Sequence, residues 1–185
     1  MLGLGQNLSS TTALQQADTP IPNGVTYTSD FSSGVDGFSA FFDNSPSAAT
    51  LTGNQDFGGK TDVLKVSWSA LEADGLFYVK RAISGFDNEV DPLAEISFDV
   101  YFEFSGATSV NSFVQAGSFA NAALNMVSEE TTANQWVTVT GSLLDGNNES
   151  SDGYIYIGFL DTTDKPDAGD NMYVTNIVFT FSDNS

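Results

Sequence analysis

The densest group of residues that could do chemistry lies near the C-terminus, where four aspartates fall within ten residues: Asp161, Asp164, Asp167 and Asp170. Carboxylate oxygens are ligands that Ca²⁺ prefers, so this density is typical of a calcium site. The run lacks the D-x-D-x-D-G spacing and the terminal glutamate of an EF-hand loop. The alternative, which we favour, is a solvated turn in which aspartate side chains bond to the nearby backbone.

Catalytic chemistry has few candidates. No His or Cys occurs among the 185 residues, which excludes Ser-His-Asp triads, thiol chemistry and the common zinc, iron and copper sites. A glycosidase needs two carboxylates about 5–10 Å apart in a cleft, and no Asp or Glu sits in a recognisable catalytic frame. We therefore expect a protein that is not an enzyme and has no catalytic residues. If any cofactor is bound, we expect structural Ca²⁺.

Aromatic residues are the other candidate, because pyranose rings stack on exposed Trp or Tyr. Four of them fall out of phase with the apolar rows of their segments: Tyr101, Trp136, Tyr154 and Tyr156. If the segments that hold the three tyrosines are neighbouring strands, these tyrosines form one patch that contacts carbohydrate or another subunit. The alternative is three ordinary half-buried tyrosines, which sheets commonly carry.

The charge of the chain limits its partners. Its formal net charge is −19, from 24 Asp and Glu against 5 Lys and Arg. Such a field repels phosphate backbones, so we expect no nucleic-acid partner. No run of 18 apolar residues exists, and we expect no membrane partner. The many Ser, Thr, Asn and Gln residues suit a protein that works outside a cell or in a virion.

The elements that must position these residues are strands. Aromatics and Gly are frequent and Lys and Arg are rare, a composition typical of all-β proteins. Alternation is clearest over residues 94–104, where five apolar residues two positions apart predict one buried face: Ile96, Phe98, Val100, Phe102 and Phe104. Trp68 shares a face with Leu64 and Val66, and we expect it in the core.

About ten strands are expected in all, from eleven candidate segments. We place them at residues 25–31, 37–43, 48–52, 63–68, 76–83, 94–104, 113–119, 122–127, 135–143, 154–160 and 172–181. Short strands joined by Gly, Asn and Asp turns predict a β-sandwich or barrel. The stretch GNQDFGGKTDVLKVSW, residues 53–68, is interpreted as a polar connection that leads into a core strand.

The first 24 residues differ from the rest. They end in Pro20-Ile21-Pro22-Asn23-Gly24, which marks a boundary. We expect an extended arm over residues 1–24 and a single domain over residues 25–185. The arm has no basic segment or long apolar run of a secretory signal, so a native Met1 implies synthesis without the usual export. Its leucines are too few for a core and are expected to contact a neighbouring subunit: Leu2, Leu4, Leu8 and Leu14.

Several segments resemble the frame of jelly-roll carbohydrate-binding modules: DFSSGVDGF at residues 30–38, then GGKTDVLKVSW, QWVTVTGSL and MYVTNIVFTF. The resemblance covers residues 25–181 and implies an antiparallel jelly-roll β-sandwich. Such modules often carry a structural Ca²⁺ between the first and last strands, which implies Asp30 as a metal ligand. Asn176 stands where the closing strand commonly has Asp.

A narrower resemblance covers nearly the whole chain, on MLGLGQNLSS, SDFSSGVDGF, GNQDFGGKTDVL and a closing strand that contains NI. These segments are similar to small structural proteins of marine bacteriophages, cyanophages especially. The resemblance implies a non-enzymatic virion protein, such as a capsid decoration or cement, neck, tail or fibre component. Its partners would be other virion proteins, copies of itself and cell-surface glycans. The alternative is the carbohydrate-binding module of a secreted polysaccharide-degrading enzyme, and a catalytic domain is the third class.

Overall fold

The structure, a computed structural model, describes residues 25–42, 48–70, 76–82, 93–106, 108–116, 126–144, 154–160 and 167–182. Within these residues the regular structure is eleven strands, so the all-β prediction is confirmed. No helix in the described part of the chain is long and apolar enough to cross a membrane. The expected N-terminal arm, with its four leucines, lies outside the described residues.

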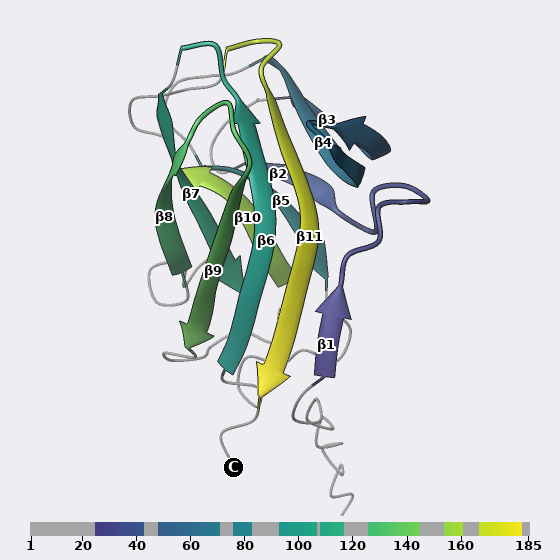
Figure 1. Cartoon of the computed structure of the whole chain (residues 1–185), viewed down its shortest axis with the longest axis vertical. Coiled ribbons are helices and arrows are strands. Elements are labelled where there is room, and N and C mark those ends of the chain that lie inside the picture. Colours follow the sequence, from purple (N-terminus) through teal and green to yellow (C-terminus); the bar gives the residue numbers. More distant parts are fainter. Residues whose placement is uncertain are drawn as a thin grey trace, which may run out of the picture.

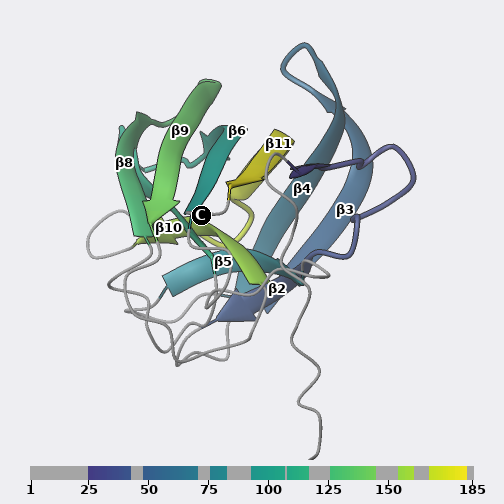
Figure 2. The same ribbon diagram turned by 90° about the horizontal axis from the view of Figure 1, so that it is seen from below.

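The strands form two antiparallel sheets (Figure 1). Sheet A has the order β3 (Ala48–Phe57), β4 (Lys60–Ala70), β11 (Asn171–Ser182), β6 (Leu93–Glu103) and β9 (Val137–Leu144), and β1 (Val25–Thr28) pairs with the far half of β11. Sheet B has the order β2 (Ser39–Phe42), β5 (Leu76–Ala82), β10 (Tyr154–Leu160), β7 (Ser109–Ala116) and β8 (Met126–Thr132). Figure 1 looks onto sheet A, and Figure 2 shows the two sheets as separate layers.

The core lies between these layers and follows from the alternation of the strands. The five apolar residues of 94–104 that were expected to be buried are at most 3% exposed. Aromatic rings fill the middle of the sandwich, where Phe159 lies 5.2 Å from Phe104 and 5.7 Å from Phe102 between ring centroids. Trp68 is 2% exposed and packs against Phe159, so its predicted place in the core is confirmed. Burying each such side chain contributes about 1.5–3 kcal/mol.

Several expected strand boundaries are wrong, among them that of the strand expected at residues 113–119, which runs over Ser109–Ala116. Residues 53–62 were interpreted as a polar connection, but β3 continues to Phe57 and β4 begins at Lys60, with only Gly58 and Gly59 between them. Both glycines have positive φ, 59° and 84°, as a two-residue hairpin turn requires. The eighth strand runs over Met126–Thr132 rather than residues 122–127, because a polar Ser-Glu-Glu-Thr-Thr run pairs with β7 despite its weak apolar pattern.

Candidate functional site

The four aromatic residues singled out in the sequence lie on two different sheets. Tyr101 on β6 and Trp136 just before β9 belong to sheet A, with ring centroids 5.7 Å apart. Tyr154 and Tyr156 lie on β10 in sheet B, with centroids 6.0 Å apart. The strands β6 and β10 are not neighbours, so the tyrosines form no single patch. The two pairs lie in different surroundings and are described in turn.

The pair on sheet B faces away from the core. Ile155, Ile157 and Phe159 point into the sandwich, so the alternate residues of β10 lie on the outer face. Tyr154 is partly exposed and Tyr156 is 3% exposed. The ammonium of Lys80 on β5, the register partner of Tyr156, lies 4.8 Å from the centroid of the Tyr154 ring. This face therefore carries a partly exposed aromatic ring with a cation beside it.

The pair on sheet A is packed beneath the β3–β4 hairpin. The Phe57 ring stacks on Tyr173 with centroids 3.6 Å apart and an interplanar angle of 4°. The same ring lies 4.9 Å from Tyr101 and 6.3 Å from Trp136, and the Lys60 ammonium lies 5.1 Å from the Trp136 ring. We call these residues the hairpin cluster. Its rings are largely occupied by one another, which makes it a small second core on the outer face of sheet A.

The β3–β4 hairpin lies over these rings because its two strands are irregular at positions that face each other. The β3–β4 register shifts on either side of Gln55. Asn54 and Asp62 have φ of 53° and 54°, a left-handed conformation that Asn and Asp tolerate better than other non-glycine residues. Bulges of this kind bend a strand pair. In Figure 2 the hairpin tip lies on the outer side of sheet A.

Gly58 is the point where the hairpin backbone meets the cluster. A Cβ at Gly58 would lie 2.5 Å from Nε1 of Trp136, and that buried indole N–H has no hydrogen-bond partner among the described residues. We expect Gly58→Ala to lower the free energy of unfolding by about 2 kcal/mol, because it adds a clash to the strain of a positive φ. Urea unfolding measures the loss.

Gly59→Ala is the matched control for that substitution. Gly59 also has a positive φ, but nothing lies within 4 Å of its Cβ position. We expect Gly59→Ala to lower the free energy of unfolding by only about 1 kcal/mol, because an alanine is strained in the left-handed conformation. Equal losses in the two variants would show that the contact with Trp136 has no part in the stability of the hairpin.

A carboxylate is buried beside the hairpin cluster. Asp99 on β6 is 8% exposed. It accepts hydrogen bonds from Lys60 at 2.9 Å, from the amide of Asn176 at 2.6 Å and from the hydroxyl of Thr138. Burial alone would raise the pKa of Asp99, but the bonds from Thr138, Asn176 and Lys60 hold it below its ordinary value. The ionised carboxylate therefore ties the hairpin to β6, β9 and β11.

This network makes hairpin stability depend on pH. The folded-state pKa of Asp99 is lowered. Its contribution to the free energy of unfolding is therefore fully present above the unfolded-state pKa of about 3.9, and it is lost as the pH falls through the folded-state pKa. We expect Asp99→Asn to cost about 1–2 kcal/mol at pH 7 and much less at pH 2.5. Urea unfolding of both proteins at several pH values measures the difference. A cost that does not change with pH would contradict the charged network.

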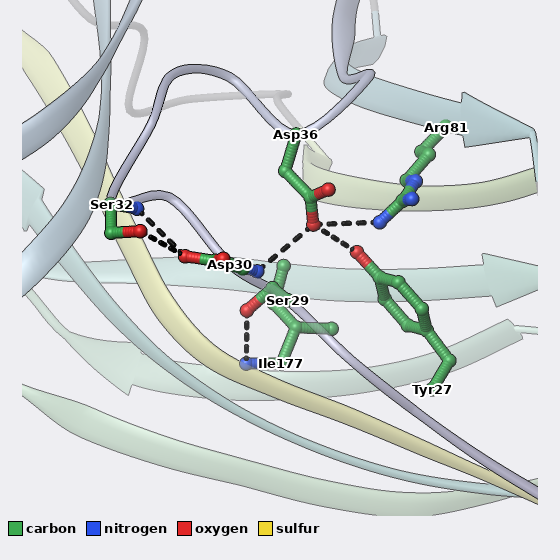
Figure 3. A network of polar contacts seen from close by, with 7 residues as sticks. All are labelled: Tyr27, Ser29, Asp30, Ser32, Asp36, Arg81 and Ile177. Carbon is green, nitrogen blue, oxygen red and sulfur yellow. Dashed lines mark hydrogen bonds and ion pairs between the residues drawn. The ribbon is translucent and has the colours of Figure 1, made fainter.

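A second polar network joins the two sheets around Asp36 (Figure 3). The Asp36 carboxylate accepts hydrogen bonds from the Tyr27 hydroxyl at 2.6 Å, the Asp30 backbone N–H at 3.0 Å and Arg81 at 2.7 Å. Tyr27 lies on β1 of sheet A and Arg81 on β5 of sheet B. Burial raises the pKa of Asp36 and lowers that of Arg81, so the ion pair offsets a desolvation cost. The network holds the loop between β1 and β2, residues 29–38, which we call the first loop, between the two sheets.

The predicted metal ligands that the structure describes bond to nearby groups. Asp30 accepts hydrogen bonds from the backbone N–H and the hydroxyl of Ser32, which lower the pKa of its carboxylate. Asp170 accepts from the backbone N–H of Asp167, as in a turn. Asp161 and Asp164 lie outside the described residues. No group of three or more metal-binding side chains occurs in the described part. A Ca²⁺ site thus stays a prediction.

Comparison with known proteins identifies the fold. The chain matches no family model and no curated protein. Among solved structures, it is similar to the CBM22-1 xylan-binding domain of Paenibacillus barcinonensis Xyn10C, with a TM-score of 0.57 and 15% identity over 89% of this chain and 99% of that one.

Two further structures agree. The C-terminal family 22 carbohydrate-binding module of Clostridium thermocellum Xyn10B has a TM-score of 0.52 and 20% identity, over 88% of this chain and 98% of that one. The family 11 module of the same organism, solved with a β-1,3-1,4-mixed-linked tetrasaccharide, has a TM-score of 0.52 and 16% identity, over 89% and 100%. The predicted jelly-roll β-sandwich and its resemblance to carbohydrate-binding modules are confirmed at the level of the fold.

Proposed function

We propose that this chain is a non-catalytic carbohydrate-binding module that works outside the cell and takes polysaccharide on the outer face of sheet B. The observation that carries the proposal is the partly exposed ring of Tyr154, which lies against Tyr156 and has Lys80 beside it. Polysaccharide binding by proteins of the same fold, among them a xylan-binding domain, supports it. The alternative interpretation of the sequence thus has better support than the virion role.

The accessible part of this face lies around Tyr154. From Tyr154 to Gly158, β10 spans about 13 Å at 3.3 Å per residue, but Tyr156 is 3% exposed and Gly158 is buried. The Tyr154 ring provides an apolar surface for the C–H face of one unit, and the Lys80 ammonium lies 4.8 Å from the centroid of that ring. A sugar chain bound here would therefore make its main contact at Tyr154 rather than along the whole strand.

The charge of the chain sets the class of polysaccharide. With a net charge of −19, the protein repels glycans that carry uronate or sulfate groups. Neutral glycans are not repelled in this way. We therefore propose a neutral polysaccharide as the ligand.

Isothermal titration of the intact chain tests this proposal. We expect saturable binding of xylohexaose or a mixed-linked β-glucan tetrasaccharide, and no heat from an oligogalacturonate of equal length. Raising the salt concentration screens the repulsion and should leave the binding of the neutral sugars unchanged. Tight binding of the acidic sugar alone would overturn the assignment.

The virion role stays a prediction without support from the structures reported above, which are carbohydrate-binding modules. Its main argument, the docking arm of residues 1–24, lies outside the described residues. The same holds for the proposed boundary between arm and domain. The two roles imply different locations, the virion for the first and the extracellular space for the second, and both are non-catalytic.

A further inference from the structure

An open pocket of about 410 Å³ lies on the outer face of sheet A, on the opposite side of the sandwich from Tyr154. Three adjacent strands line it, with β6 between β9 and β11. Its lining residues are Glu95, Ile96, Ser97, Thr140, Gly141, Val178 and Thr180. The volume falls in the range of small-molecule sites, and no part of the function proposed above uses this pocket.

The hollow arises from a block of small side chains in register. Ser97 on β6 has Thr140 and Val178 as its partners on the two neighbouring strands. In the next row of the same face, Glu95 pairs with Thr180. Toward the other end of the strands, Thr138 and Asn176 both donate to the Asp99 carboxylate, which also bonds to Lys60 of the β3–β4 hairpin. The part of the face that the hairpin does not cover is the pocket, and no residue that lines it is larger than Glu95 or Ile96.

The lining has the chemistry of a sugar site. Ser97, Thr140 and Thr180 carry hydroxyls that donate and accept, and the exposed Glu95 carboxylate accepts. The methyl groups of Val178 offer an apolar contact for a C–H face. No Lys or Arg is among the lining residues, so a phosphate or carboxylate ligand would meet Glu95 without a counter-charge.

We propose a second glycan-binding site in this pocket, for a neutral sugar of one or two units. It goes beyond the function proposed for sheet B, because it lies on the other face and does not require the first site to bind. Along β9 the same face leads from Thr140 to Trp136 over about 13 Å, so a longer chain reaches the exposed edge of the hairpin cluster. Two sites on opposite faces would let one module hold two polysaccharide chains.

The test fills the pocket and compares electrophoretic retardation in gels that contain neutral polysaccharide, either soluble xylan or mixed-linked β-glucan. Thr140 is exposed on a strand, where Trp is well tolerated, so Thr140→Trp closes the pocket without disturbing the core. Thr50→Trp is the control, because Thr50 is exposed on β3 of the same sheet and outside the lining. Thermal melting of each variant confirms that it is folded.

We expect Tyr154→Ala to keep a residual retardation that Thr140→Trp in the same chain abolishes, while Thr50→Trp leaves it unchanged. Thr140→Trp alone should weaken apparent binding at least threefold. If Thr140→Trp has no effect in either background, the second site is overturned and the sheet B proposal stands. If Tyr154→Ala has no effect and Thr140→Trp abolishes retardation, the pocket is the only site and the sheet B proposal fails.

Discussion

Replacing Tyr154 by Ala is expected to weaken the binding of a neutral oligosaccharide to sheet B by about 10–100-fold, because truncating an aromatic anchor typically costs about 1.4–2.8 kcal/mol. Tyr154 is the partly exposed member of the β10 pair. Its loss removes the stacking surface and the ring that positions the Lys80 ammonium. Isothermal titration with xylohexaose measures the change in Kd.

Tyr154→Phe separates stacking from hydrogen bonding at the same position. It keeps the ring and removes only the hydroxyl, so we expect binding within about threefold of the unaltered protein. Because the side chain is partly exposed on the outer face, neither substitution should lower the melting temperature by more than a few degrees. Equal losses in the Phe and Ala variants would contradict a stacking role for this ring.

The largest loss of stability is expected from Gly53→Ala. A Cβ at Gly53 would lie 1.8 Å from the carbonyl oxygen and 2.2 Å from the carbonyl carbon of Gly34. Both are backbone atoms, so the first loop or β3 must move. The Asn54 N–H donates to the Phe31 carbonyl at 2.7 Å across the same contact, and any displacement weakens that bond as well. We expect a loss of about 3 kcal/mol, or failure to fold.

Gly106→Ala is the matched control for this prediction. Gly53 lies within β3 and Gly106 lies just beyond β6 of the same sheet. Nothing lies within 4 Å of the Cβ position of Gly106, and neither glycine has a φ in the left-handed range. We expect a change of less than about 1 kcal/mol, because Ala restricts the unfolded chain and meets no clash. Urea unfolding compares the two variants. A Gly53→Ala protein as stable as the control would contradict the close approach of β3 to the first loop.

Much of the fold was predictable because one sheet face is buried. The alternation in residues 94–104 is a strict period of two, and all five of its apolar residues lie in the core. The same logic correctly placed Trp68. It works because a shift of one residue would turn a whole apolar row toward solvent, so the pattern specifies the face without any knowledge of the neighbouring strands.

The grouping of the aromatics was not predictable in this way. Alternation says which side of its own strand Tyr101 or Tyr154 occupies, but it does not say which sheet the strand enters. That depends on the strand order, in which β6 lies between β11 and β9 and β10 lies between β5 and β7. Pairings of this kind join residues far apart in the sequence, and no local signal encodes them.

The hairpin cluster was also missed, although a signal for part of it exists. Gly58-Gly59 between two alternating segments is a pattern typical of a two-residue hairpin, and Phe57 beside it is the residue that stacks on Tyr173. The polar side chains around Phe57 interrupt the apolar alternation by which a strand is recognised. The burial of Asp99 follows from the hairpin, because Lys60 reaches that carboxylate only once the bulges have bent the strands.

The central claim, that the outer face of sheet B binds a neutral glycan, is tested most directly by mapping backbone amide chemical shifts while xylohexaose is added to the intact chain. We predict that the largest saturable shifts fall on residues 154–158 of β10 and on Lys80 of β5. Shifts around Ser97 and Thr140 would report the second pocket separately. If no amide of β5 or β10 shifts at millimolar concentrations of xylohexaose or of the mixed-linked β-glucan tetrasaccharide, the claim is contradicted.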